Sequence, residues 1–120
     1  MPTTVLIVDD EFGLADILAD LLRELGYDVE IAINGKLGLT SLHMRPASIV
    51  LVDLMMPVMD GPEMIRAMRA DPALANIPII LMTALPEGIP KDDSVRSDAV
   101  LVKPFGFAEL LAVMKRLLRT

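Results

Sequence analysis

Two kinds of hydrophobic pattern alternate along this chain. Short continuous apolar runs, which are typical of parallel strands covered on both faces, occur four times. These runs are Val5–Val8, Ile49–Val52, Ile79–Met82 and Val100–Val102. Apolar and polar residues instead alternate over residues 28–33, which predicts an edge strand with one partly wet face.

Helical patterns lie between these runs. Apolar residues spaced three or four apart predict a helix from Leu14 to Leu25, and the same spacing recurs from Phe107 to Leu118. A proline in the first turn favours a third helix over residues 62–69. Residues 35–44 show a weaker helical pattern, because two glycines lower the helix propensity there. The alternation of strands and helices predicts a doubly wound α/β fold with a parallel sheet.

Composition narrows the class of protein. A chain of 120 residues has the size of one domain, so we expect residues 1–120 to form a single unit. Cysteine is absent from the sequence, which excludes disulfides and thiolate metal sites. No apolar run reaches the roughly 20 residues of a membrane span, and the start of the chain is unlike a signal peptide. The net charge of −6 argues against direct nucleic-acid binding. We therefore expect a cytoplasmic domain that binds neither membrane nor nucleic acid.

Polar residues follow the predicted strands, and these carry the candidate chemistry. Asp9 and Asp10 follow the first strand, Asp53 the third, Thr83 the fourth and Lys103 the fifth. Because the carboxyl ends of parallel strands share one edge of the sheet, we expect these five side chains to converge.

Three carboxylates at one sheet edge need a counter-charge. Two carboxylates about 5 Å apart repel by roughly 3 kcal/mol at an effective dielectric near 20. A hard divalent cation reverses the sign of this interaction, and Mg²⁺ requires only one or two carboxylates besides water and phosphate oxygens. The acid cluster therefore predicts a metal site.

Four stretches of the sequence resemble the receiver domain of two-component response regulators. They are VLIVDDE, LVDLMMPVMDG, IPIILMTAL and LVKPF. The resemblance spans essentially the whole chain, so it implies one receiver domain. It also implies a flavodoxin-like fold, with a five-stranded parallel sheet in the order 2-1-3-4-5 and helices on both faces.

The resemblance also implies a function and the residues that perform it. Asp53 would accept a phosphoryl group from phosphohistidine, while Thr83 and Lys103 would bind phosphoryl oxygens. The bond between Lys103 and Pro104 would be cis, as is usual in the family. The implied partners are a sensor histidine kinase or histidine phosphotransfer protein and a downstream output protein or domain.

A metal site forms part of the same resemblance. Asp9 and Asp10 would hold Mg²⁺ or Mn²⁺, directly or through water, helped by the Asp53 carboxylate and the backbone carbonyl of Met55. Apolar Met55 and Leu85 flank the path of an attacking water in the family pattern. We therefore expect slow self-dephosphorylation and not the turnover of an ordinary enzyme.

Other interpretations compete with this one. Taken singly, each motif has a simpler interpretation: an Asp-Asp pair is ordinarily a helix cap, Thr83 would be a strand-end hydroxyl, and Lys103 would be a solvated charge. These simpler interpretations are disfavoured together, because four separate strand ends match the same kind of site. A flavodoxin would need a Ser-, Thr- or Gly-rich loop where this chain is acidic. A haloacid-dehalogenase-type phosphatase would need a second acid after Asp53. The main alternative is a phosphorylation-independent pseudo-receiver that serves as a docking module.

Several positions depart from the family pattern. Val100 occupies the switch position that usually holds Tyr or Phe. The segment between Thr83 and Lys103 is short and contains two prolines and a glycine near its start, so we expect a short or irregular fourth helix. His43 is expected on the surface without a partner acid, and residues 91–98 as solvated surface. The output, the oligomeric state and whether the chain is a complete protein stay open.

Overall fold

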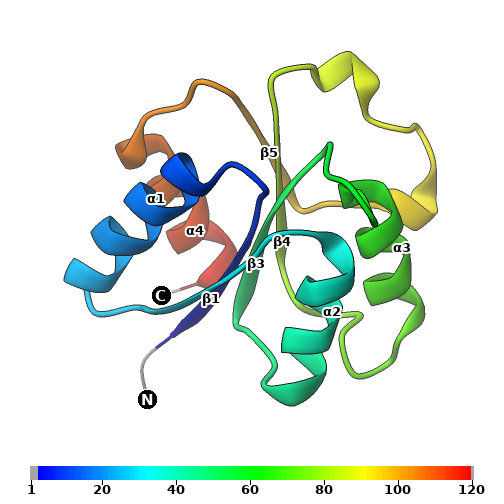
Figure 1. The fold of residues 1–120 in the computed structure, drawn as a ribbon, viewed down its shortest axis with the longest axis horizontal. Helices are drawn as coiled ribbons and strands as arrows, with labels where there is room; N and C mark the ends of the chain where they lie inside the picture. Colours follow the sequence, from blue (N-terminus) through cyan, green and yellow to red (C-terminus); the bar gives the residue numbers. More distant parts are fainter. Residues whose placement is uncertain (1–2, 120) are drawn as a thin grey trace.

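A central sheet lies between two layers of helices in the computed structural model, which describes residues 3–119 (Figure 1). The five strands are β1 (Thr4–Val8), β2 (Asp28–Ala32), β3 (Ile49–Asp53), β4 (Ile79–Thr83) and β5 (Ala99–Val102). All paired strands are parallel, and their order is β2-β1-β3-β4-β5. The predicted flavodoxin-like order is thus confirmed, and β2 is an edge strand as its alternating pattern indicated.

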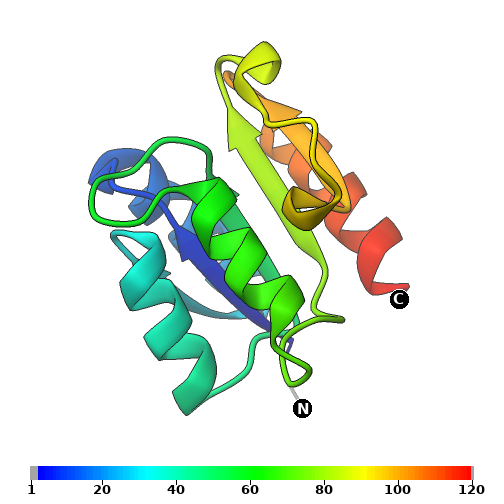
Figure 2. The same ribbon diagram turned by 90° about the vertical axis from the view of Figure 1, so that its right-hand side faces the viewer.

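Four α-helices cover the two faces of this sheet. They are α1 (Phe12–Glu24), α2 (Gly35–Met44), α3 (Gly61–Ala70) and α4 (Phe107–Leu118). One face packs against α1 and α4, and the other packs against α2 and α3, which Figure 2 views from outside. Within residues 3–119, no helix is long and apolar enough to cross a membrane.

The weaker helical pattern of residues 35–44 forms a regular helix because its glycines meet neighbouring elements closely. A Cβ atom at Gly38 would lie 2.8 Å from Cε of Met64 and 3.1 Å from Cγ2 of Val8. A side chain at this position would therefore push α2 away from α3 and the sheet. The low helix propensity of glycine is offset by this close packing.

The crossover from β4 to β5 contains no α-helix in the described structure. Two short 3₁₀ turns replace it, η1 (Pro86–Gly88) and η2 (Asp93–Val95). The second turn lies beside α3 (Figure 2). Val95 of this turn is buried in the core on that side of the sheet. The prediction of a short or irregular helix between Thr83 and Lys103 is confirmed, since this segment forms only the two 3₁₀ turns. Residues 91–98 are mostly exposed, as expected for solvated surface, but Val95 is buried and anchors the segment.

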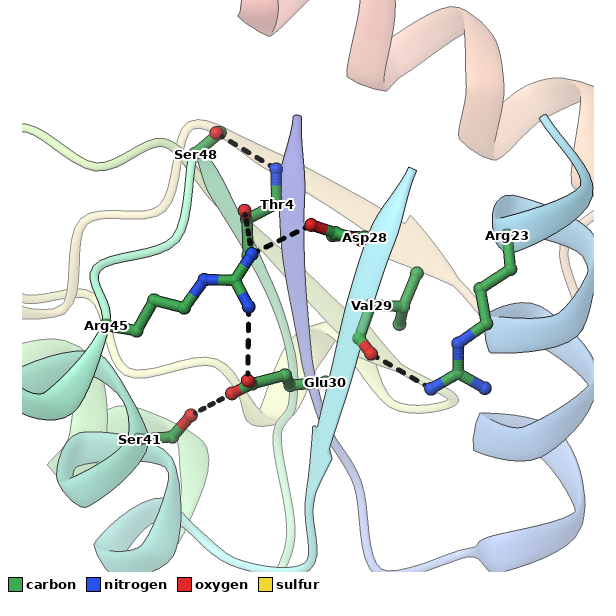
Figure 3. A network of polar contacts seen from close by, with 8 residues as sticks. All are labelled: Thr4, Arg23, Asp28, Val29, Glu30, Ser41, Arg45 and Ser48. Atoms are coloured by element: carbon green, nitrogen blue, oxygen red, sulfur yellow. Dashed lines mark hydrogen bonds and ion pairs between the residues drawn. The ribbon is translucent and has the colours of Figure 1, made fainter. Parts of the chain in front are cut away.

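A polar network joins the end of α2 to the amino ends of β1 and β2 (Figure 3). Arg45 donates to Asp28 at 2.8 Å and to the hydroxyl of Thr4 at 3.2 Å, and its other guanidinium nitrogen lies 3.7 Å from Glu30. Ser41 of α2 donates to the same Glu30 at 2.8 Å. These contacts hold the C-terminal end of α2 against the amino ends of the strands, which is the end of the sheet opposite the predicted site.

His43 has a partner acid, contrary to the sequence-based expectation. Its Nε2 lies 3.0 Å from Oδ2 of Asp71, the residue that caps the C-terminus of α3. The two residues are 28 positions apart in the sequence, so the pair arises only from the packing of α2 against α3. His43 is exposed, as expected.

Candidate phosphoacceptor site

The five side chains expected to converge lie together at the carboxyl edge of the sheet. Asp9 follows β1, Asp53 ends β3, Thr83 ends β4 and Lys103 follows β5. A cavity of about 280 Å³ opens between these strand ends. Its lining consists of Asp10, Glu11, Asp53, Leu54, Met55, Thr83, Ala84, Leu85 and Lys103. The parallel topology therefore brings four of the five predicted residues to the lining of one hollow, and the fifth, Asp9, is fully buried beside Lys103.

Asp9, Asp10 and Asp53 form the acidic side of the site. One carboxylate oxygen of each lies within 4.8 Å of the others. Asp9 and Asp53 are buried, whereas Asp10 is exposed. A cation placed among these oxygens would touch two carboxylates held by the core and one that faces solvent.

The turn after β1 holds Asp9 in place. Its backbone N–H donates to the carbonyl of Ala32 at 3.0 Å, which extends the pairing with β2 by one residue. Its Oδ1 accepts the backbone N–H of Glu11 at 2.9 Å. One carboxylate oxygen of Asp9 is therefore used locally, and Oδ2 points toward the ammonium group of Lys103.

Lys103 supplies the positive charge of the site. Its Nζ lies 3.1 Å from Oδ1 of Asp53, 3.3 Å from Oδ2 of Asp9 and 3.9 Å from Oε1 of Glu11. Only 15% of the side chain is exposed. The backbone N–H donates to the carbonyl of Thr83 at 2.8 Å, and the bond to Pro104 is cis, as the resemblance implied. Lys103 thus bridges the buried carboxylates.

The pKa values of two groups reflect this environment. Burial raises the pKa of the Asp53 carboxyl, the negative charge of Asp9 raises it further, and Lys103 offsets only part of the increase. Burial would lower the pKa of the Lys103 ammonium, but the charges of Asp9 and Asp53 outweigh it and the pKa is raised. Lys103 therefore remains charged at neutral pH.

Thr83 places a hydroxyl on the wall of the cavity. Its side chain is buried, and Oγ1 accepts the backbone N–H of Leu85 at 2.9 Å. The hydroxyl hydrogen is still able to donate to another oxygen. Thr83 can therefore serve as a hydrogen-bond donor on the cavity wall.

The loop after β3 presses closely against Asp53. The N–H of Gly61 donates to the carbonyl of Leu54 at 3.0 Å, and a Cβ atom at Gly61 would clash with the backbone oxygen of Asp53. Asp60 and Glu63 form a capping box at the start of α3. Glycine at position 61 thus lets α3 begin directly beside the strand that carries Asp53, while Met55 is left exposed at the mouth of the cavity.

Glu11 is a residue of the site to which sequence reasoning gave no role. It completes the acidic run that begins at Asp9, lines the cavity and faces Lys103. The site thus contains four carboxylates and one ammonium group. The sequence signal for Glu11 was its place as the third consecutive acid after the first strand. Its closeness to Lys103 could not be predicted in this way, because Glu11 follows β1 and Lys103 follows β5, and β3 and β4 lie between these strands.

The donor set fits a hard divalent cation. Three carboxylate oxygens lie within reach of one another, and Mg²⁺ prefers oxygen ligands while keeping several waters. The exposed side chain of Asp10 leaves room for those waters. Among the residues that line the cavity there is no imidazole or thiolate, and the thioether of Met55 is the one sulfur, so the carboxylate oxygens favour a hard cation over softer metals.

Known proteins are similar to this chain in both sequence and structure. The family model described as "Response regulator receiver domain" matches residues 5–115. Sensory transduction protein RegX3 of Mycobacterium tuberculosis (strain CDC 1551 / Oshkosh) is 37% identical over 119 residues, which is 98% of this chain and 51% of RegX3. The CpxR homolog of Haemophilus influenzae, a transcriptional regulatory protein, is 37% identical over 96% of this chain and 50% of its own length. The chain spans about half the length of these curated relatives.

Solved structures agree with the family match. A putative response regulator from Chloroflexus aurantiacus superposes with a TM-score of 0.92 at 28% identity, covering 100% of both chains. The receiver domain of sensor histidine kinase PA1611 from Pseudomonas aeruginosa superposes with a TM-score of 0.91 at 28% identity, also over 100% of both chains. That structure contains a magnesium ion coordinated in its active site cleft. Together with its own acidic pocket, these matches show that the chain belongs to the response regulator receiver domain family of two-component signalling.

Proposed function

We propose that Asp53 accepts a phosphoryl group from a phosphohistidine and that the chain acts as the phosphoacceptor of a two-component phosphorelay. The observation that carries the proposal is the position of Asp53. Its buried carboxylate lies 3.1 Å from Lys103, shares the acidic cluster with Asp9 and Asp10, and borders an open cavity. A carboxylate at neutral pH is a nucleophile that needs no general base.

The transfer forms one bond and breaks one. A carboxylate oxygen of Asp53 attacks phosphorus in line with the leaving imidazole nitrogen, the P–N bond breaks, and a proton from solvent neutralises the imidazole. Catalysis of this kind depends on positioning and on neutralising the charge of the equatorial oxygens. Lys103 would pair with one of these oxygens, and the Thr83 hydroxyl would donate to another.

The acidic cluster would hold the metal cofactor, Mg²⁺ or Mn²⁺. Asp9, Asp10 and Asp53 would provide carboxylate oxygens, directly or through water, and Met55 its backbone carbonyl. The bound cation would supply positive charge for the phosphoryl oxygens. The three neighbouring carboxylates support this assignment, since within residues 3–119 Lys103 is the one cationic side chain paired with them.

The phosphoryl donor would be a sensor histidine kinase or a histidine phosphotransfer protein. We place the domain in the cytoplasm, where ATP is available to the histidine kinase that starts such a relay. Residues 1–120 would form one receiver domain that changes its partner-binding face and passes the signal to an output protein or domain.

RegX3 and the CpxR homolog, about twice as long as the matched segment, show that matching receivers occur in longer regulators. The acidic chain itself would not bind nucleic acid.

Phosphorylation by acetyl phosphate tests the proposal. Wild type incubated with acetyl phosphate and Mg²⁺ should gain one phosphoryl group by intact mass, and omission of Mg²⁺ should strongly reduce the yield. Asp53→Asn should gain none, whereas Asp16→Asn, an exposed aspartate of α1, should label like wild type. Unchanged labelling of Asp53→Asn would exclude this acceptor. Failure of wild type to label beside a positive control would favour the pseudo-receiver.

The phosphorylated state should be long-lived. Met55 and Leu85 are both exposed apolar residues on the wall of the cavity that a hydrolytic water must enter. Neither offers a strong hydrogen bond to orient that water, and such positioning is worth several kcal/mol in favourable cases. Decay should therefore accelerate in Met55→Asn and Leu85→Glu. Equal decay rates in wild type and both variants would show that apolar walls do not set the lifetime.

A further inference from the structure

The methionines of this chain differ widely in exposure. Of the nine in the sequence, eight lie within residues 3–119. Met64, Met68, Met82 and Met114 are fully buried, and Met56 and Met59 are partly buried. The two that are exposed are Met44 at 83% and Met55 at 68%. Reactivity of a thioether toward oxidants follows its access to solvent, so these two side chains are the open ones in this part of the chain.

The two exposed methionines lie at opposite ends of the sheet. Met55 lines the cavity beside Asp53 and also a second hollow of about 330 Å³ with Asp10 and Asp60. Met44 ends α2 next to Arg45, which bonds the first residues of β1 and β2 (Figure 3). Met44 is thus a built-in control for the chemistry of Met55, since it matches in exposure but not in position.

We propose that Met55 is an oxidation site through which a hydroperoxide alters the lifetime of the phosphoryl group on Asp53. The sulfur lone pair attacks the terminal peroxide oxygen, an S–O bond forms and the O–O bond breaks. The thioether is oxidised by two electrons to the sulfoxide, and the peroxide is reduced to water or, for an organic peroxide, to the alcohol. The effect on lifetime rests on the proposed phosphoacceptor function, whereas the oxidation itself does not.

The position of Met55 on the cavity wall is the reason why its oxidation would affect the phosphoryl group on Asp53. The apolar part of the cavity wall consists of Leu54, Met55, Ala84 and Leu85. Of these four, only Met55 can become polar without a change of sequence, since sulfoxidation turns a weak acceptor into a polar group with a strong acceptor oxygen. This oxygen would lie at the mouth of the cavity, where it can accept a hydrogen bond from an entering water.

The expected direction is a faster loss of the phosphoryl group. A water that donates one hydrogen bond to the sulfoxide is held near the phosphorus, and one ordinary hydrogen bond corresponds to about fivefold in rate. The carboxylates at the site do not prevent this, because the sulfoxide remains uncharged.

Two matched variants separate the sites. In Met44→Leu only Met55 remains among the two exposed methionines, and in Met55→Leu only Met44 remains; leucine keeps the apolar volume in both. Each protein is treated with hydrogen peroxide, freed of oxidant, and mapped by peptide mass spectrometry for sulfoxide at every methionine. It is then phosphorylated with acetyl phosphate and Mg²⁺, and decay is followed by intact mass.

The expected result is sulfoxide at Met55 in Met44→Leu, with decay about fivefold faster than in the untreated variant. Treated Met55→Leu should decay like its untreated form, and methionine sulfoxide reductase should restore the slow rate in Met44→Leu. Sulfoxide absent from Met55 while Met44 is oxidised would overturn the proposed site. Equal decay with and without Met55 sulfoxide would overturn its effect. If untreated wild type gains no phosphoryl group, the proposed function fails, while mapping still decides whether Met55 is oxidised.

Discussion

Arg69 of α3 and Asp98, the residue before β5, form an ion pair with 3.0 Å between Nη2 and Oδ2. The same carboxylate oxygen accepts the backbone N–H of Ile79 at the start of β4, at 2.8 Å. Arg69 also donates to the carbonyl oxygens of Ala75 and Arg96, both at 2.9 Å. Arg69 thus fastens the crossover between β4 and β5 to α3, and Asp98 ties the same crossover to the start of β4.

Loss of Arg69 should destabilise the fold. Only 11% of its side chain is exposed, and truncation leaves the part-buried carbonyl oxygens of Ala75 and Ile77 without their donor. We expect Arg69→Ala to lower the free energy of unfolding by about 2–3 kcal/mol in urea denaturation. Arg66→Ala is the control, because Arg66 is 44% exposed and lies 3.7 Å from Asp92. It should cost less than about 1 kcal/mol. Equal losses in the two variants would contradict the fastening role.

A strained turn lies in the loop after Asp53. Val58 has φ of 69°, and the N–H of Met59 donates to the carbonyl of Pro57 at 2.7 Å. A positive φ is unfavourable for a β-branched residue, because its Cβ substituents crowd the backbone there. Val58 is 74% exposed, so its replacement costs little packing.

Substitution of Val58 should therefore stabilise the protein. Asparagine tolerates the left-handed region, so Val58→Asn should raise the free energy of unfolding by about 1 kcal/mol. Val58→Ala should gain less, because alanine loses the branch but keeps the unfavourable φ. Urea denaturation of the three proteins measures the order. A loss of stability in Val58→Asn would show that the turn is not strained by valine.

The acid cluster should destabilise metal-free protein. Asp10 is exposed, so solvent screens its repulsion with Asp9 and Asp53, and Asp10→Asn should gain up to about 1 kcal/mol in EDTA. With saturating Mg²⁺ the order should reverse, since wild type binds the ion more tightly and binding stabilises the folded state. Thermal unfolding with EDTA and with Mg²⁺ measures both effects. The same difference in both buffers would exclude Asp10 as a metal ligand.

The raised pKa of Asp53 predicts a pH dependence of stability. Between the ordinary pKa of an Asp carboxyl and the raised value, the folded protein binds more protons than the unfolded protein. The free energy of unfolding therefore falls as pH rises through this interval, and the cost of the ionised carboxylate persists above it. Asp53→Asn cannot ionise and should be more stable than wild type in EDTA at about pH 7, with a smaller difference at about pH 4.

Urea titrations at the two pH values test this sign. Asp16→Asn is again the control, because its exposed carboxylate lies outside the site. A stability difference that grows on acidification would contradict the direction given for the Asp53 pKa.

Much of the fold and the site follows from local pattern. Continuous apolar runs identify β1, β3 and β4, which are covered on both faces, and alternation identifies β2. The apolar run of β5 also marks a strand, but the prediction that it is covered on both faces is wrong, since Val100 and Val102 are 41% and 46% exposed. The polar residues that end these strands are directly readable. Since parallel strands end at one edge, Asp9, Asp53, Thr83 and Lys103 could be assigned to one site without coordinates.

Tertiary structure decided what depends on pairs distant in the sequence. His43 finds Asp71 only because α2 packs on α3, and Arg69 reaches Asp98 only because the crossover lies along α3. No periodicity encodes such contacts. The same holds for Glu11, whose acid charge was visible in the sequence. Its distance from Lys103 depends on how β1, β3, β4 and β5 are ordered and twisted in space.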